Sequence, residues 1–292
     1  MNSAKIRTTT TTTPQHILAL HWILRIAFVM DFIGHGTYGF LQKVSFTRYL
    51  GFVGIPPEIG IHYLPVIGTH DYILALSVLF VPTRGVLLWG AIWGLWTALL
   101  RPFTGESWWE VLDRGGNYGM PFALLLLAGF PRTGKEWFAR IRNWSLPPAR
   151  VNAFAWTLRI ATGFLLIGHG GYGAFVPKAV LLKHWAAIGV GPDIFGPGML
   201  LPVIGWFEIA LGVATLIRPL PFLLFFIFAW KVGTEMLYPI SGQPALHPIF
   251  EFIERGGAYA CPLALALLLH WRSQDALASP ASGAAVPVAS RA

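Results

Sequence analysis

Charged residues are scarce in this chain. Of its 292 residues only 12% are charged, whereas 55% are hydrophobic and 14% are aromatic. A soluble domain carries about twice that fraction of charge. Apolar runs of roughly 17–25 residues, the length that crosses a bilayer, recur along the sequence. The composition excludes an ordinary soluble domain and predicts an all-α, polytopic membrane helix bundle that lies in a lipid bilayer.

Cysteine and the common catalytic signatures are also nearly missing. Cys261 is the single cysteine, so the sequence offers neither a disulfide framework nor a CxxC redox pair. It contains no Walker loop, no HExxH motif and no GxGxxG after a strand. The net charge of +8 comes from short basic loops rather than a solvated domain. Nucleic acid is therefore not expected as a partner.

The chain does contain one sequence pattern that occurs twice. LRIAFVMDFIGHGTYGF at 24–40 returns as LRIATGFLLIGHGGYGAF at 158–175. LPVIG at 64–68 returns at 201–205, and DRGGNY at 113–118 returns as ERGGAY at 254–259. This self-similarity indicates duplication of one unit. The predicted organisation is a tail (1–16), a four-helix repeat (17–132), a basic linker (133–152), a second four-helix repeat (153–272) and a tail (273–292).

Eight membrane spans follow from the apolar runs, four in each repeat. The tails, the linker and the turns at Arg84 and Arg218 are basic, whereas the intervening loops are acidic. The positive-inside rule then places both termini and the linker in the cytoplasm, with disordered tails. An even number of spans per repeat leaves the repeats parallel, related by an axis along the membrane normal. The predicted spans are 18–41, 61–82, 84–101, 114–131, 154–176, 198–217, 220–238 and 255–271.

Two histidines sit in matching Gly-His-Gly motifs inside predicted spans. Ionisable groups in the hydrocarbon are costly, so each is a candidate for function. His35 and His169 could both ligate the iron of a b-type haem between the repeats, because haem accepts neutral imidazole and glycine lets a flat ligand approach. Alternatively, the glycines form a helix-packing surface and the histidines hydrogen-bond across it.

Three acids are the candidates for proton handling. Asp31 lies four residues before His35, on the same helix face, and could orient its imidazole or simply form a buried packing pair. Asp71 and Glu208 occupy equivalent positions six residues after the proline of each LPVIG. Either could receive protons, hydrogen-bond a quinone head group, or pair with Lys231 or an arginine. His70, beside Asp71, is a further cofactor-binding candidate.

Each repeat has an arginine at the start of its last predicted span. Arg114 and Arg255 could bind an anionic substrate or lipid and are counted among the cofactor-binding candidates. A simpler alternative is that each pairs with the glutamate four residues earlier, Glu110 or Glu251, in the favourable helical order.

The same positions carry a family resemblance. Leu24, Arg25, Gly34, Gly39 and Lys43, then GFVGIPPEIG, an acid on the second span and DRGGNY, resemble the DoxX-like membrane proteins. The second repeat offers Leu158, Arg159, Gly168, Gly173, Lys178, IGVGPDIFG, Glu208 and ERGGAY. That family is typically a single four-helix unit, and its best-known members are subunits of a thiosulfate:quinone oxidoreductase. This chain differs in its duplication, its Gly-His-Gly motifs and the lack of a closing Ser-Leu-Asp.

The resemblance implies a multi-pass protein of the bacterial inner membrane that is associated with quinone and with a partner redox subunit. The first function hypothesis is therefore a redox-associated subunit, a component of a quinone-linked oxidoreductase, with quinone or a b-type haem between the repeats. The alternatives are a small-solute transporter and a non-catalytic assembly subunit of a membrane complex.

Overall fold

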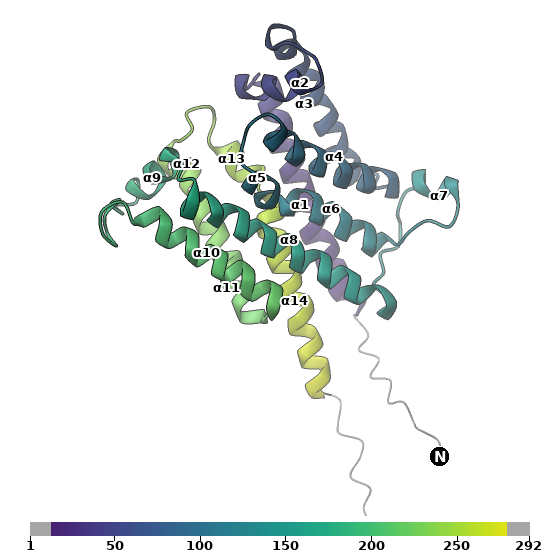
Figure 1. The fold of residues 1–292 in the computed structure, drawn as a ribbon. Helices are drawn as coiled ribbons and strands as arrows, with labels where there is room; N and C mark the ends of the chain where they lie inside the picture. Colours follow the sequence, from purple (N-terminus) through teal and green to yellow (C-terminus); the bar gives the residue numbers. More distant parts are fainter. Residues whose placement is uncertain (1–12, 279–292) are drawn as a thin grey trace, which may run out of the picture.

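Helices account for every named element in the computed structural model, which describes residues 13–278 (Figure 1). The first half contains α1 (Pro14–Phe40), η1 (Val44–Phe46), α2 (Thr47–Phe52), α3 (Pro57–Phe80), α4 (Arg84–Phe103), α5 (Trp109–Asp113) and α6 (Gly115–Ala128). After α7 (Gly134–Phe138) come α8 (Pro148–Phe175), α9 (Ala179–Ala186), α10 (Leu200–Ile217), α11 (Pro221–Glu235), α12 (Leu237–Ser241), α13 (Ile249–Ile253) and α14 (Gly256–Ala278). The all-α prediction is confirmed.

Membrane-spanning character extends over most of these helices. In the described part of the chain, seven helical segments are long and apolar enough to cross a bilayer: Pro14–Phe40, Pro57–Phe80, Arg84–Phe103, Pro148–Phe175, Leu200–Ile217, Pro221–Ser241 and Ile249–Gln274. The predicted span 114–131 corresponds to α6, which has 14 residues and is about 21 Å long. A hydrocarbon core is about 30 Å thick. The chain is a multi-pass membrane protein, and the count of eight stays a prediction.

The four helices that begin and end each half, α1, α6, α8 and α14, form the centre of the bundle. α1 packs on α3 and on α14, while α8 packs on α10 and on α6. α6 is short because it needs no lipid contact: most of its residues are buried among α1, α4, α8 and α14. The first helix of each half therefore packs against the last helix of the other half, and the two halves interlock.

The Gly-His-Gly motifs lie on the surface where the two halves interlock. A Cβ atom built on Gly34 would lie 2.5 Å from the backbone nitrogen of Glu254, and one on Gly168 would overlap the backbone of Asp113. Only glycine lets α1 and α8 approach the opposite half this closely. The helix-packing alternative for these glycines therefore describes the structure.

Matched contacts recur at equivalent positions of the sequence repeat. The Arg25 guanidinium donates to the carbonyl of Val78 at 2.8 Å, and Arg159 donates to Thr215 at 3.0 Å. Two ion pairs also join the halves in reciprocal fashion. Lys43 pairs with Glu251 at 2.7 Å, and Lys178 pairs with Glu110 at 2.8 Å. These contacts fit the prediction of two parallel repeats, which stays a prediction.

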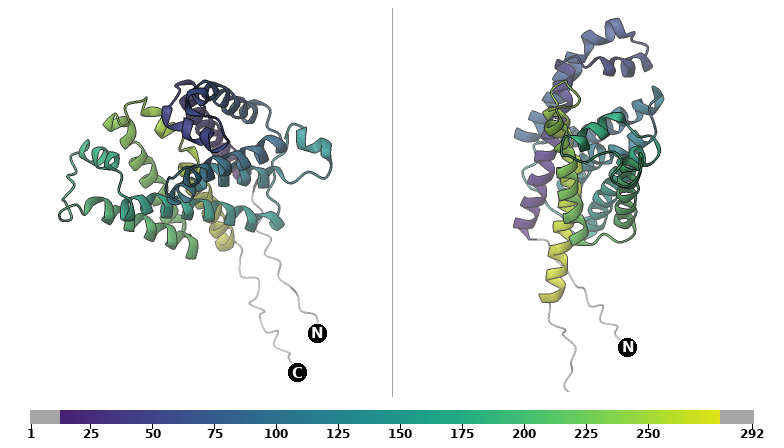
Figure 2. Two further views of the ribbon diagram at one scale, coloured as in Figure 1. Left: turned by 45° about the horizontal axis from the view of Figure 1, so that its top comes forward. Right: turned by 90° about the vertical axis from the view of Figure 1, so that its left-hand side faces the viewer.

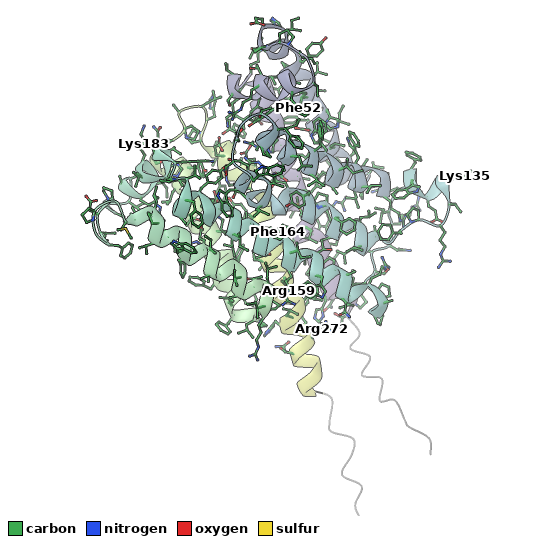
Figure 3. The ribbon with its side chains drawn as sticks, in the orientation of Figure 1. Phe52, Lys135, Arg159, Phe164, Lys183 and Arg272 are labelled. Carbon is green, nitrogen blue, oxygen red and sulfur yellow. The ribbon has the colours of Figure 1, made fainter. Side chains whose placement is uncertain are left out.

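The ends of the described chain lie on one side of the molecule. The start of α1 and the end of α14 are both at the lower edge in Figure 1, and the views in Figure 2 agree. Lys135 on α7 and Lys183 on α9 lie at opposite edges (Figure 3). An even number of crossings requires such an arrangement of the ends, and the cytoplasmic assignment stays a prediction.

The predicted tails and linker differ from the structure at their borders. Residues 1–12 and 279–292 of the tails lie outside the described residues. Residues 14–16 belong to α1, and 273–278 belong to α14. The linker contains α7 and the first turn of α8, which starts at Pro148 because proline suits the first helical position.

Candidate functional site

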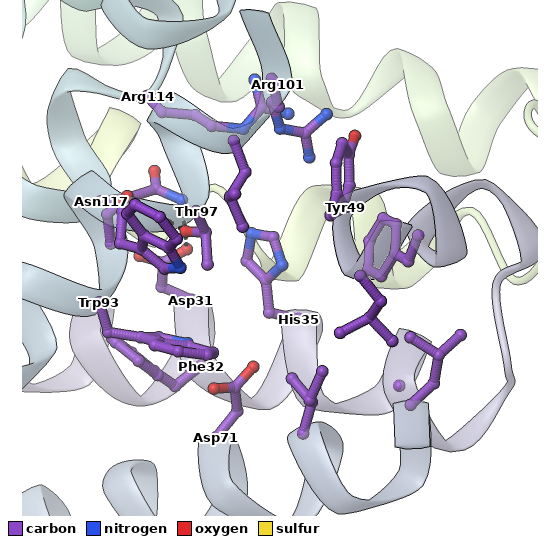
Figure 4. Close-up of a pocket in the computed structure, with 18 of the residues that line it drawn as sticks. Asp31, Phe32, His35, Tyr49, Asp71, Trp93, Thr97, Arg101, Arg114 and Asn117 are labelled. Atoms are coloured by element: carbon purple, nitrogen blue, oxygen red, sulfur yellow. Dashed lines mark hydrogen bonds between the residues drawn. The ribbon is translucent and has the colours of Figure 1, made fainter. Parts of the chain in front are cut away.

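A cavity of about 230 Å³ opens inside the first half of the chain (Figure 4). Its walls come from α1, α3, α4 and α6, with η1 and α2 closing one side. The cavity lies within one half, whereas the sequence predicted a ligand between the two halves. The aromatic part of the wall is Phe32, Phe46, Tyr49, Trp93 and Trp96. The polar part is Asp31, His35, Asp71, Thr97, Arg101, Arg114 and Asn117.

Asp31 and His35 both face this cavity from α1. Asp31 is 2% exposed, and its carboxylate accepts a hydrogen bond from Asn117 Nδ2 at 3.0 Å. The hydrogen bonds of the described residues do not include one between Asp31 and His35, so the predicted orienting contact is absent there. Figure 4 shows His35 near the centre of the cavity, with Asp31 and Asp71 on one side of it and Tyr49 on the other.

Asp71 reaches the cavity from α3 and is supported from behind by a histidine. Trp89 Nε1 donates to His70 Nε2 at 2.8 Å, which leaves the protonated Nδ1 of His70 to donate to Asp71 Oδ1 at 3.0 Å. His70 therefore does not line the cavity, although the sequence marked it as a cofactor-binding candidate. The His70 imidazole is thus placed to orient the Asp71 carboxylate.

Arg101 and Arg114 line the opposite end of the cavity. Arg114 forms an ion pair with Glu110, and Arg101 lies 3.4 Å from Glu106 and 3.5 Å from Glu110. In the second half, Arg255 pairs with Glu251 at 3.0 Å. Arg114 and Arg255 therefore each form the predicted ion pair with the glutamate four residues earlier. At this end of the cavity, Arg101 and Arg114 thus face it with their charges paired to Glu106 and Glu110, and anion binding by Arg114 and Arg255 stays a prediction.

The short helix α2 covers the cavity, packs on α3 and α4, and is hydrogen-bonded to one glutamate. Glu106, in the loop after α4, accepts hydrogen bonds from Tyr49 and Arg48 of α2 and lies beside Arg101. Burial acts to raise the pKa of Glu106, but Arg101, the Tyr49 hydroxyl and Arg48 outweigh it and hold that pKa below its usual value. Glu106 therefore stays ionised at neutral pH and fixes α2 over the site.

The second half contains an ion cluster where the first half has its cavity. His169 Nδ1 lies 2.5 Å from Glu208 Oε2, and Lys231 Nζ lies 2.6 Å from Glu235 Oε1 and 3.8 Å from Glu208 Oε1. Arg255 adds a contact of 2.9 Å to Glu235. The cavity beside His169 and Glu208 measures about 30 Å³, enough for roughly one or two waters. The predicted pairing of Glu208 with Lys231 is present.

His35 and His169 line different cavities. His35 borders the large cavity and a polar one of about 20 Å³ that Glu254 also lines, with 3.9 Å between its Nδ1 and Glu254 Oε2. His169 borders the cavity of the ion cluster. Within the described residues, no group of three or more His, Cys, Asp or Glu side chains is arranged to hold a metal ion. Haem ligation by both histidines stays a prediction, and this arrangement gives it no support.

Sequence reasoning missed four polar groups of the cavity: Tyr49, Thr97, Arg101 and Asn117. Asn117 had a detectable signal, because DRGGNY and ERGGAY differ there by asparagine against alanine, and a polar residue in only one copy marks a local difference. Tyr49 lies on a loop helix whose position over the cavity depends on a contact with Glu106, which is distant in the sequence. No local pattern predicts such a contact.

Comparisons with protein-family models, with curated proteins and with solved structures found no match to the chain. The function proposed below is therefore based on the geometry of the cavity.

Proposed function

We propose that the chain is a redox-associated membrane subunit that binds a quinone-type ligand in the cavity of its first half. The observation that carries this proposal is the composition of that cavity wall. Aromatic rings line it, and two buried carboxylates and one imidazole reach into the same space. A ligand that fits is small, flat and apolar, with polar oxygens at its edge.

The polar groups suit a ligand that exchanges protons. Asp31 and Asp71 are 2% and 4% exposed, and both face the cavity beside His35. A carboxylate can accept the proton of a ring hydroxyl, and a protonated carboxyl or imidazole can donate to a ring carbonyl. These three residues therefore bind the ligand and handle protons in the proposal. Electrons pass to or from a redox group of a partner subunit, as the DoxX resemblance suggests.

The proposed location is the bacterial inner membrane, with both termini and the linker in the cytoplasm. α1 then runs outward, and the cavity, near its C-terminal end, lies toward the outer leaflet. Lipid-soluble ligands reach such a depth directly from the bilayer.

Quinone binding to the purified full chain tests the proposal. Menadione and its reduced form, menadiol, serve as probes, and at least one of them should bind the protein in detergent, measured by equilibrium dialysis. Asp71→Asn and His35→Ala should each weaken binding about tenfold, the effect of losing one hydrogen bond to a charged or buried group. His62→Ala is the matched control, because His62 is exposed on α3 and does not line the cavity.

Binding that is unchanged in Asp71→Asn and His35→Ala, or no binding of either probe, would refute the proposal. A small-solute transporter and a non-catalytic assembly subunit would then be the remaining hypotheses. An absorption spectrum of the same preparation checks haem independently, because a haem band that is lost in His35→Ala would identify an axial ligand.

A further inference from the structure

The two halves of the chain differ most at the place where one has a cavity and the other has an ion cluster. When the two LPVIG motifs are aligned, Asp71 corresponds to Glu208, and Trp93 corresponds to Trp230. Asp71 lies on α3 and Glu208 on α10, whereas Trp93 lies on α4 and Trp230 on α11. The cavity is about 230 Å³ in the first half and about 30 Å³ in the second. The same scaffold is thus open in one copy and filled in the other.

Two substitutions between the copies lie beside this place. Lys231 stands where the first half has Gly94, and Glu235 stands where it has Ala98. The Lys231 side chain is fully buried, and its ammonium bridges Glu235 and Glu208. Glu208, the counterpart of Asp71, therefore has a cationic donor group 3.8 Å away, supplied by the chain itself. Its hydrogen bonds come from His169 and Trp230.

The first half supplies no such donor. Among the described residues, no lysine or arginine nitrogen lies within 4.0 Å of Asp31 or Asp71, whose polar contacts are Asn117 and His70. A lysine could not stand at Gly94, because a Cβ atom there would lie 2.6 Å from the carbonyl oxygen of Asn117. Buried carboxylates without a cation are costly in an apolar layer. The open space beside them is where a compensating group fits.

We infer that the ligand of the first-half cavity presents a hydrogen-bond donor, a hydroxyl or an ammonium on an apolar ring, to Asp71 and Asp31. That donor takes the place that the Lys231 ammonium takes in the second half. The inference rests on the proposed function. If the ligand is a quinone, the hydroxyl of its reduced form, the quinol, is the donor, and the cavity selects the quinol. An aromatic amine carries the same donor chemistry without the redox chemistry.

The test compares three probes on the full chain in detergent by equilibrium dialysis: menadiol kept reduced without oxygen, menadione, and phenylethylamine. Menadiol should bind about tenfold more tightly than menadione, the effect of one charge-assisted hydrogen bond. Asp71→Asn should bring that ratio close to one, whereas Glu58→Gln, an exposed acid at the start of α3, should leave it unchanged.

The outcomes separate this inference from the proposed function. Equal binding of menadiol and menadione, or tighter binding of menadione, overturns the inference and leaves quinone binding in place. Binding of phenylethylamine alone supports the inference and overturns quinone binding. If none of the three probes binds, both fail.

A second variant tests the comparison between the halves by a gain of binding. Lys231→Gly combined with Glu235→Ala restores the first-half residues at both positions and leaves the net charge unchanged. The expected result is a rise from one to two menadiol sites per chain. Lys231→Met, which keeps the volume filled, should stay at one site. A folded double variant with one site would overturn the inference, and if the double variant does not fold, the menadiol-to-menadione ratio above decides.

Discussion

Gly116 and Gly257 form one of the places where the two halves of the chain touch backbone to backbone. A Cβ atom on either would lie 2.6 Å from the carbonyl carbon of the other. Backbone cannot move away as a flexible side chain can, so any side chain there must separate α6 from α14. The Lys43–Glu251 and Lys178–Glu110 pairs bind the same two halves from outside this contact.

We predict that Gly116→Ala lowers the free energy of unfolding by about 1–3 kcal/mol, the usual cost of overpacking. Gly233→Ala is the control, because Gly233 lies within α11 and a Cβ there would meet nothing within 4 Å. Alanine should stabilise that site by roughly 0.5–1 kcal/mol through its better helix propensity. Denaturant unfolding in detergent measures both variants, and equal effects would show that the glycine contact is not tight.

A second prediction at the residue scale concerns Arg25. Its guanidinium is 8% exposed and donates to the last carbonyls of α3, those of Val78 and Leu79. These carbonyls have no partner in the helix, so Arg25→Met leaves them unsatisfied. The expected loss of stability is about 1.5–3 kcal/mol. Lys135→Met, an exposed change on α7, should alter it by less than about 0.5 kcal/mol.

At the scale of elements, α2 is the piece whose position decides access to the cavity. It has six residues, fewer than an isolated helix needs to be stable, so its order depends on contacts. α2 packs on α3 and α4, and Glu106 adds hydrogen bonds from Tyr49 and Arg48. Because Tyr49 lines the cavity, releasing α2 also opens the site.

The lowered pKa of Glu106 makes this contact dependent on pH. A carboxyl whose pKa is lower in the folded than in the unfolded state contributes stability above its unfolded value of about 4.5. That contribution is lost as the pH falls through the lower, folded value. We expect the protection of the α2 amides against hydrogen exchange, relative to the intrinsic rate at each pH, to be high at pH 7 and to fall in acid.

In Glu106→Gln the protection of the α2 amides should already be low at pH 7 and should fall little further in acid. Glu58→Gln, which removes an exposed acid, should behave as the original chain does. If α2 in Glu106→Gln keeps its protection, Glu106 does not hold α2.

For the whole molecule, the arrangement of basic and acidic loops predicts how the bundle lies in the membrane. Lys135 on α7 and Asp193 in the loop before α10 belong to segments with opposite predicted sides. Cys261 is buried and single, so a Cys261→Ser background allows single cysteines to report topology. Asp193→Cys should react with an impermeant maleimide on intact cells, and Lys135→Cys only after the cells are opened. Labelling of both from outside would contradict the predicted orientation.

The sequence alone determined the helical membrane fold and most of the polar candidates. Apolar runs define helices because the bilayer fixes their length, and the duplicated motifs located Asp31, His35, Asp71 and Glu208. The pairing of Arg255 with Glu251 followed from helical spacing, since residues four apart share a face. Each of these features is local in the chain.

Only the tertiary structure decided which half has a cavity. That depends on how helices distant in sequence pack around one volume: the ion pairs of Lys231 lie there in one half, and Gly94 lines an open cavity in the other. It also decided that Asn117 meets Asp31 and that Glu106 holds Tyr49. Hydropathy and spacing describe one segment at a time, whereas cavities and ion clusters are properties of segments brought together.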